Sequence, residues 1–171
     1  MQRGRWRRRQ RVRWGSNISE NKPYDACIQR AANLIDSKEF DEAVDHLLSA
    51  ESDWKKTKLY QAYLGYAYFY TDEFGKAILC FDKVLSEVEA AENILFMRGL
   101  SFDRLDDVES ALKDYLQVLK INPEAQSVHR NIGLLYESLG NLQKAKDYYE
   151  LAFDIDDNDP GIRQRLAGLN F

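Results

Sequence analysis

The sequence has few of the residues and patterns that would place it among secreted, membrane or metal-binding proteins. Only three prolines occur in 171 residues, which leaves room for long helices. Its two cysteines, Cys27 and Cys80, lie far apart and form no CxxC pair, so we expect free thiols in a reducing compartment. Residues 1–22 hold no apolar run of the secretory type, and no apolar stretch is long enough to cross a bilayer. We therefore expect a cytoplasmic protein without a membrane span.

Catalytic and metal-binding patterns are missing as well. The two histidines, His46 and His129, have no cysteine or carboxylate at metal-ligand spacing. The phosphate-loop, nucleophile-elbow and HExxH patterns do not occur. The acidic run at 155–159 has no calcium-loop pattern and is expected to be a solvated turn. The sequence thus predicts a protein that is not an enzyme and that has no cofactor and no metal site.

Charge is divided unevenly along the chain, whose net charge is −4. Residues 1–22 contain seven arginines and one lysine against one glutamate, whereas the remainder contains 16 basic and 27 acidic side chains. A basic leader therefore precedes an acidic body, and each needs its own interpretation.

The body repeats itself every 34 residues. The repeating columns contain one alanine, one small residue and two large residues: Ala43, Ala77, Ala111 and Ala145; Ala31, Gly65, Gly99 and Gly133; Leu34, Tyr68, Phe102 and Tyr136; Leu47, Phe81, Tyr115 and Tyr149. A repeat of this length fits two helices of three to four turns and two short turns. Small residues let the paired helices approach closely, and stacking of the hairpins buries the apolar stripes that one hairpin cannot bury alone.

This frame predicts eight paired helices and a short final one. Turn or cap residues fall between the paired helices, at Ser37, Asp72, Asp106 and Gly140-Asn141. The expected helices are 24–36, 40–52, 58–70, 74–86, 92–104, 108–120, 126–138 and 142–154. Pro160 suits a first helical turn, so we expect residues 160–171 to cap the stack.

The repeating residues resemble those of the tetratricopeptide repeat family. The match is strongest in YLGYAYFY with FGKAILCFDKVL, continues in RGLSFDRL with SALKDYLQVLKINP and in NIGLLYESLGNLQKAKDYYELAF, and is weakest in AANLIDSKEFDEAVDHLLSA, which lacks the glycine. The resemblance implies an all-α, right-handed α-α solenoid of four helical hairpins with a short C-terminal capping helix. We expect a leader at 1–22 and one domain at 23–171, with repeats at about 24–57, 58–91, 92–125 and 126–159 and a cap at 160–171.

In this family the first helix of each hairpin lines a concave face. The resemblance therefore implies a partner-binding set on that face: Ile28, Ile35, Leu59, Tyr63, Tyr66, Phe69, Tyr70, Phe96, Met97, Leu100, Arg104, Arg130, Asn131 and Leu134. Tyrosine offers a large contact area with a polar tip and loses little entropy on binding. We expect a scaffold or adaptor that holds a peptide or helix segment of another protein. Some of these aromatic residues are alternatively explained by packing between hairpins.

One group of relatives binds the acidic tails of heat-shock chaperones with a clamp of lysine, asparagine and arginine. The matching positions here hold Ile28, Ala32, Tyr63, Asn93 and Met97. Such side chains cannot pair with a carboxylate as that clamp does. The sequence therefore argues against a chaperone-tail partner.

The leader has several competing interpretations, which include contact with an anionic membrane surface and docking on the acidic body of its own chain. Its arginines, with two tryptophans among them, suit RNA or another polyanion: Arg5, Arg7, Arg8, Arg9, Arg11 and Arg13. Gly15-Ser16 resembles a cloning scar, which would make the leader a remnant or a solvated tail. An RNA-associated protein is therefore the alternative to a protein scaffold, with nucleic acid expected only through the leader. Self-association through solenoid ends or the apolar groove also remains open.

Overall fold

The computed structural model describes residues 22–50, 52–88 and 90–169, and these residues form helices joined by short turns. The helices are α1 (Lys22–Asp36), α2 (Phe40–Leu48), a short 3-10 helix η1 (Trp54–Lys56), α3 (Lys58–Tyr70), α4 (Phe74–Leu85), α5 (Glu92–Arg104), α6 (Val108–Ile121), α7 (Gln126–Ser138), α8 (Leu142–Ile155) and α9 (Pro160–Gly168).

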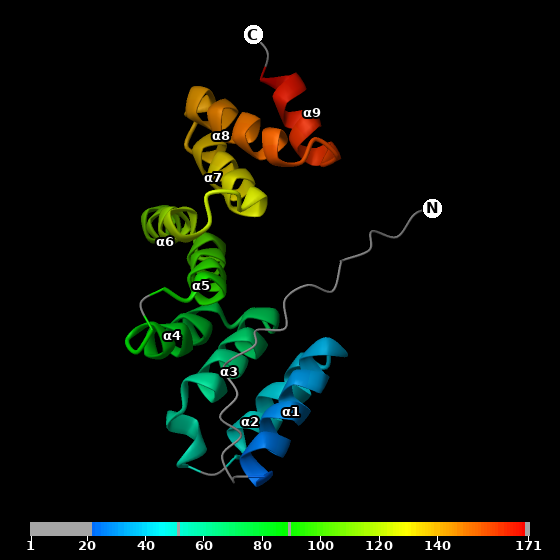
Figure 1. Cartoon of the computed structure of the whole chain (residues 1–171), viewed down its shortest axis with the longest axis vertical. Coiled ribbons are helices and arrows are strands. Elements are labelled where there is room, and N and C mark those ends of the chain that lie inside the picture. The colour runs from blue at the N-terminus through cyan, green and yellow to red at the C-terminus, as the bar shows by residue number, and fades with distance from the viewer. Residues whose placement is uncertain (1–21, 51, 89, 170–171) are drawn as a thin grey trace.

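Consecutive helices pair into four hairpins that stack along one axis, from α1 and α2 at the bottom of Figure 1 to α9 at the top. The first helices α1, α3 and α5 contact one another in turn, and α4 packs on α5 as α6 packs on α7. This arrangement is the expected all-α solenoid of repeated hairpins. We call the side formed by α1, α3, α5 and α7 the first-helix face.

The predicted helices are confirmed to within two residues at nearly every end. The exception is the second helix, which was expected to reach residue 52 but ends at Leu48. The η1 segment then carries the chain to Thr57, whose side chain caps α3 by accepting the Tyr60 amide. The first repeat therefore has a shorter second helix than the other three.

The turns inside the hairpins share one backbone conformation. The residue at the same column of each repeat has a positive φ: Lys38 at 64°, Asp72 at 60°, Asp106 at 58° and Gly140 at 72°. This left-handed conformation suits glycine and is tolerated by aspartate, whereas it is uncommon for lysine. Asp107 and Asn141 then cap α6 and α8 through their side chains.

Close helix packing explains the glycine column. A Cβ atom built on Gly65 would lie 2.6 Å from the ring of Phe81, and one on Gly133 would lie 2.6 Å from the ring of Tyr149. Gly99 faces Tyr115 in the same way, at 2.8 Å. In the first repeat the corresponding residues are Ala31 and Leu47, both fully buried. A smaller partner therefore leaves room for the methyl group of alanine.

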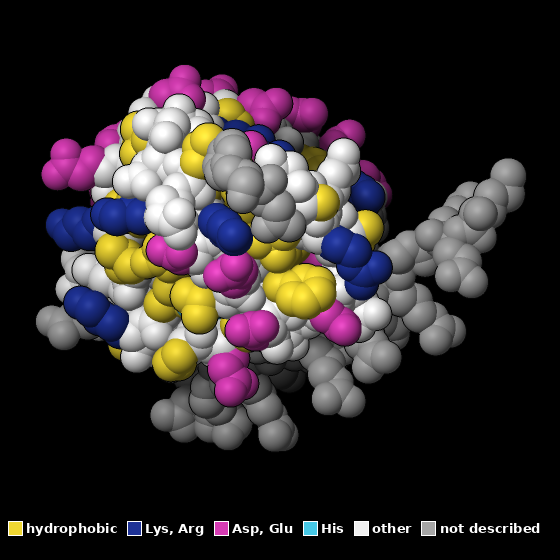
Figure 2. Space-filling view, turned by 90° about the horizontal axis from the view of Figure 1, so that it is seen from above, with side chains coloured by type: hydrophobic (Ala, Val, Ile, Leu, Met, Phe, Trp, Pro, Cys, Tyr) yellow, Lys and Arg dark blue, Asp and Glu magenta, His cyan; other side chains and the backbone are white. Residues whose placement is uncertain are grey.

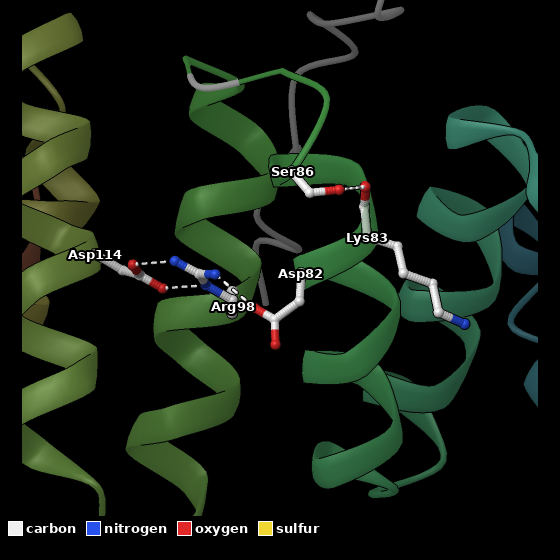
Figure 3. Close-up of polar contacts among 5 residues, drawn as sticks. All are labelled: Asp82, Lys83, Ser86, Arg98 and Asp114. Atoms are coloured by element: carbon white, nitrogen blue, oxygen red, sulfur yellow. Dashed lines mark hydrogen bonds and ion pairs between the residues drawn. The ribbon is translucent and has the colours of Figure 1, made fainter.

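A charged network joins the second and third hairpins (Figure 3). The Arg98 guanidinium on α5 donates to Asp114 on α6 through Nε and Nη2, at 2.8 and 2.7 Å, and to Asp82 on α4 through Nη1, at 2.6 Å. Asp114 is 1% exposed, so its charge depends on this two-bond pairing. These hydrogen bonds raise the pKa of Arg98 and fix the position of its side chain.

The C-terminal helix α9 covers the apolar end of the fourth hairpin. Ile162 and Leu169 are buried against Tyr149 and Ala152. The Asp159 side chain caps α9, and Arg165 donates to both carboxylate oxygens of Glu137 at 2.6 and 2.7 Å. Viewed from this end, charged side chains lie among the hydrophobic ones, with acidic side chains along the upper edge (Figure 2). The stack therefore ends in the polar cap that a solenoid needs.

Candidate functional site

Helix α3 is apolar on two opposite sides, which makes it unlike an ordinary surface helix. Tyr60 and Leu64 are buried against the first hairpin and Cys80 of α4. Leu59, Ala62, Tyr63 and Tyr66 follow the opposite side of the helix, at a spacing of three or four residues. The second stripe is only partly covered: Ala62 and Tyr66 pack against Ile94 and Met97 of α5, whereas Leu59 and Tyr63 stay half-buried.

The second stripe forms one wall of a hollow of about 230 Å³ between α3 and the start of α5. We call it the tyrosine hollow. Its residues are Leu59, Ala62, Tyr63, Tyr66, Ala91, Glu92, Asn93 and Ile94. Ala62 and Ile94 are buried and form its floor, while both tyrosines are half-buried. The hollow is thus an apolar recess with a few polar groups, which is the usual composition of a recognition site.

The tyrosine hydroxyls supply donors that stay protonated over the physiological range. Burial raises the pKa of Tyr66 to about 12, and the ring meets Phe81 edge-on at a centroid distance of 5.7 Å. Burial also raises the pKa of Tyr63, with a further contribution from the charge of Asp36. Glu92, which accepts a hydrogen bond from Asn122 at 2.9 Å, is the one carboxylate among the described lining residues. The hollow can therefore accept an apolar side chain and donate hydrogen bonds to a neighbouring carbonyl.

The residues predicted for the partner-binding face occupy three kinds of position. Leu59, Tyr63 and Tyr66 line the tyrosine hollow. Buried positions are taken by Ile28, Met97 and Asn131, and half-buried ones by Ile35, Phe69, Phe96, Leu100 and Leu134. Exposed positions are taken by Tyr70, Arg104 and Arg130. The structure thus gathers three of the predicted residues around one recess and distributes the others along the stack.

Two of the exposed residues have partners within the chain. The ring of Tyr70 stacks on Phe40 at 4.5 Å, which joins the first two hairpins. Arg130 pairs with Asp159 at 3.2 Å, which joins α7 to the turn before α9. These contacts assign both side chains a packing role in addition to the predicted binding role.

Sequence reasoning missed the far wall of the hollow. Ala91, Glu92 and Ile94 come from the turn before α5 and its first residues, and none belonged to the predicted set. A usable signal was present, because Asn93 stands one repeat after Leu59 and so continues the same column. The arginines of the leader, from Arg5 to Arg13, lie outside the described residues, and their predicted polyanion role stays a prediction.

Within residues 22–50, 52–88 and 90–169, histidine, cysteine and acidic side chains form no cluster that could hold a metal ion. No helix in the described part of the chain has the length and hydropathy needed to span a membrane.

The geometry defines a helical-hairpin repeat protein with an apolar recess on its first-helix face, and known proteins share its helical repeat. Residues 96–160 match the family model described as Tetratricopeptide repeat. Heat shock protein STI1 of Saccharomyces cerevisiae is 27% identical over 103 residues, and Tetratricopeptide repeat protein 16 of Macaca fascicularis is 27% identical over 86 residues. These matches cover 60% and 46% of this chain, but only 18% and 10% of the relatives.

Solved structures show the same fold. MamA from Desulfovibrio magneticus RS-1 superposes with a TM-score of 0.79 at 19% identity, over 87% of this chain and 84% of that chain. A crystal structure of MamA protein gives a TM-score of 0.77 at 16% identity, over 85% and 80%. Residues 96–160 thus match the tetratricopeptide repeat family, and the stack as a whole has the fold of these helical-repeat structures.

Proposed function

We propose that this chain is a protein-interaction scaffold that holds an apolar or aromatic segment of a partner in the tyrosine hollow. The observation that carries the proposal is the recess between α3 and α5, with Leu59 and Tyr63 on its open side. A repeat protein uses such surfaces for binding because its side chains lie on rigid helices and lose little entropy when a partner docks.

The chemistry of the hollow defines the segment. Its volume of about 230 Å³ is of the size that one or two large apolar side chains occupy. The hydroxyls of Tyr63 and Tyr66 can donate to backbone carbonyls of an extended or helical segment. Glu92 at the rim favours a basic or neutral residue beside the apolar anchor. A purely acidic segment is disfavoured on this face because no lysine or arginine lines the hollow among the described residues.

The test begins with peptides selected from a random displayed library on the full chain. The affinity of a selected peptide is then measured by fluorescence anisotropy for the wild type and for the double variant Leu59→Ser/Tyr63→Ser. We expect apolar or aromatic anchors in the peptides and at least roughly tenfold weaker binding by the variant, because both changes remove contact area at the recess.

Tyr70→Ser is the matched control. It removes another tyrosine ring from the same helix, but Tyr70 does not line the hollow. Its ring stacks on Phe40 instead. Its affinity for the selected peptide should equal that of the wild type. Unchanged binding by the Leu59→Ser/Tyr63→Ser variant, with helical content retained by circular dichroism, would contradict the proposal.

A further inference from the structure

The opposite side of α3 faces a second recess, which has a different chemical character. Two adjoining hollows of about 510 and 300 Å³ lie between η1, α3 and α4 and share Lys55, Lys56, Gln61 and Lys83. We call them together the lysine groove. Four of its α3 residues, Tyr60, Gln61, Leu64 and Tyr68, lie on the side of the helix opposite the tyrosine hollow, and Lys58 lines the groove from the first turn of α3. None of the five lines the tyrosine hollow. The two recesses therefore do not compete for the same surface.

Positive charge gathers at this groove although the body of the protein is acidic. Five of the ten lysines between residues 23 and 169 line it: Lys55, Lys56, Lys58, Lys76 and Lys83. Glu87 is the one carboxylate among the described lining residues. Five cations around one groove repel one another, and a protein keeps such an arrangement most easily where an anion can neutralise it.

Several of these cations are available for a ligand. Lys56 pairs with Asp53 at 3.7 Å and Lys76 with Glu73 at 3.1 Å, and both pairs are exposed, which makes them weak. Lys58 and Lys83 are exposed and have no ion pair among the described residues. Figure 3 shows the Lys83 side chain extending away from the neighbouring network of Asp82 and Arg98. The charge of Lys83 is thus directed to the groove side of α4 rather than to that network.

The wall between the lysines is apolar and contains one unpaired polar atom. Leu79 is 62% exposed at its edge, and Leu64 and Cys80 lie beneath it. Gln61 is 6% exposed; its amide nitrogen donates to the Lys55 carbonyl, but its Oε1 atom is buried without a hydrogen-bond partner. This oxygen is buried, so the groove offers a ligand its lysines and its apolar wall rather than the Gln61 amide.

We propose that the lysine groove binds an acidic peptide segment that also carries apolar anchors. The carboxylates pair with Lys58 and Lys83, and an apolar side chain covers Leu79. A bare polyanion such as nucleic acid fits less well, because it offers no aliphatic side chain for Leu79. With the tyrosine hollow on the other side of α3, the chain would then join two different segments across one helix.

The test uses a short dye-labelled peptide in which leucine and glutamate alternate, added to the full chain at low and at physiological salt. Two matched peptides replace glutamate by glutamine or leucine by serine, and a single-stranded oligonucleotide of equal charge replaces both. We expect anisotropy to show the tightest binding for the leucine–glutamate peptide. Lys58→Glu/Lys83→Glu should weaken that binding at least roughly tenfold, because two attractive charges become repulsive.

Lys113→Glu/Lys144→Glu is the matched control, because it changes the net charge equally at exposed lysines of α6 and α8 that do not line the groove. This control should bind the peptide within about twofold of the wild type, since distant exposed charges are screened. The leader is present in every variant, so binding through its arginines alone would leave all affinities equal. Equal affinities, equal losses in both double variants, or a preference for the oligonucleotide would each overturn the proposal.

Folding and independence are checked in the same experiment. Circular dichroism verifies the helical content, and Lys58→Gln/Lys83→Gln provides a milder variant that should weaken binding less than the glutamate pair. Hydrogen exchange should show peptide-induced protection in α4 and η1. The Leu59→Ser/Tyr63→Ser variant should keep full affinity for this peptide, which separates the lysine groove from the function proposed for the tyrosine hollow.

Discussion

The first and second hairpins occupy equivalent places in the repeat, yet they are packed by different means. The first places Ala31 against Leu47 where the second places Gly65 against Phe81. At the junction with the next hairpin, Leu48, Leu64 and Cys80 occupy the columns that hold Asp82, Arg98 and Asp114 one repeat later. The backbone frame is therefore compatible with both an apolar and an ionic junction.

This difference has a functional consequence. At the second junction, Arg98 forms ion pairs with two carboxylates of its own chain. Where the equivalent residue is Leu64, no ion pair joins the two hairpins among the described residues. Lys55 donates to the Leu48 carbonyl at 2.7 Å, and the other lysines line the groove. The ionic junction stabilises the stack internally, whereas the apolar junction leaves its surroundings available to a partner.

Removing the buried carboxylate should have the largest effect on stability. Asp114→Cys introduces the residue that the first junction has in that column, and it leaves Arg98 with only the exposed Asp82 as partner. We expect the free energy of unfolding to fall by about 3 kcal/mol, because a partly buried guanidinium loses two charge-assisted hydrogen bonds. Denaturant unfolding followed by circular dichroism measures this change.

The triple variant Asp82→Leu/Arg98→Leu/Asp114→Cys then converts the second junction fully to the apolar kind. Replacement of a whole ion network by apolar residues is often neutral, so most of the loss should be recovered, to within about 1 kcal/mol of the wild type. A triple variant less stable than Asp114→Cys would show that the two junctions are not interchangeable.

The contact inside the hairpin should have the next largest effect. Gly65→Ala places a methyl group against the buried Phe81 ring and should lower the free energy of unfolding by about 2 kcal/mol. The addition of Phe81→Leu reproduces the Ala31 and Leu47 pair of the first hairpin and should relieve the clash. A double-mutant cycle over the two sites measures the coupling, which we expect to be favourable by about 1 kcal/mol. Strictly additive losses would contradict the explanation of the glycine column.

The smallest expected difference between the two hairpins lies in the reactivity of their cysteine thiols, Cys27 in the first and Cys80 in the second. Burial raises the pKa of the Cys80 thiol to about 11, and it also raises the pKa of Cys27. Because only the thiolate reacts, about one Cys80 thiol in a thousand is reactive at pH 8. We expect slow reaction of both with Ellman's reagent in the folded protein and faster reaction of Cys27. Single-cysteine variants, Cys27→Ser and Cys80→Ser, separate the rates, and unfolding in guanidinium should make them equal.

Most of the fold was predictable from the sequence because the 34-residue columns define both the period and the faces of the helices. The early end of α2 was not, since the helical pattern continues past Leu48 while the local chain turns into η1. The cause of the missing glycine in the first repeat was also hidden. It becomes evident only from the structure, in which a Cβ atom on Gly65 would lie 2.6 Å from the Phe81 ring.

The candidate sites were predictable only in part. The column rule placed Tyr63 and Tyr66 on the helix face that lines the hollow, but it could not show that the turn before α5 closes the hollow with Ala91 and Ile94. The lysine groove was missed because its lysines come from η1, α3 and α4 and follow no single helical stripe. Charge gathered by tertiary structure leaves no periodic signal in the sequence.

The contact between glycine and ring has a consequence for how such hairpins diverge after duplication. A hairpin with glycine and leucine carries only a small void and a flexible residue, whereas one with alanine and an aromatic ring carries a clash. The order of substitutions between the two hairpin types is therefore fixed. The aromatic residue must be replaced by leucine before glycine is replaced by alanine, and in the reverse direction alanine must be replaced by glycine first. We therefore expect the two positions to change together, as alanine with leucine at Ala31 and Leu47 or as glycine with an aromatic ring at Gly65 and Phe81.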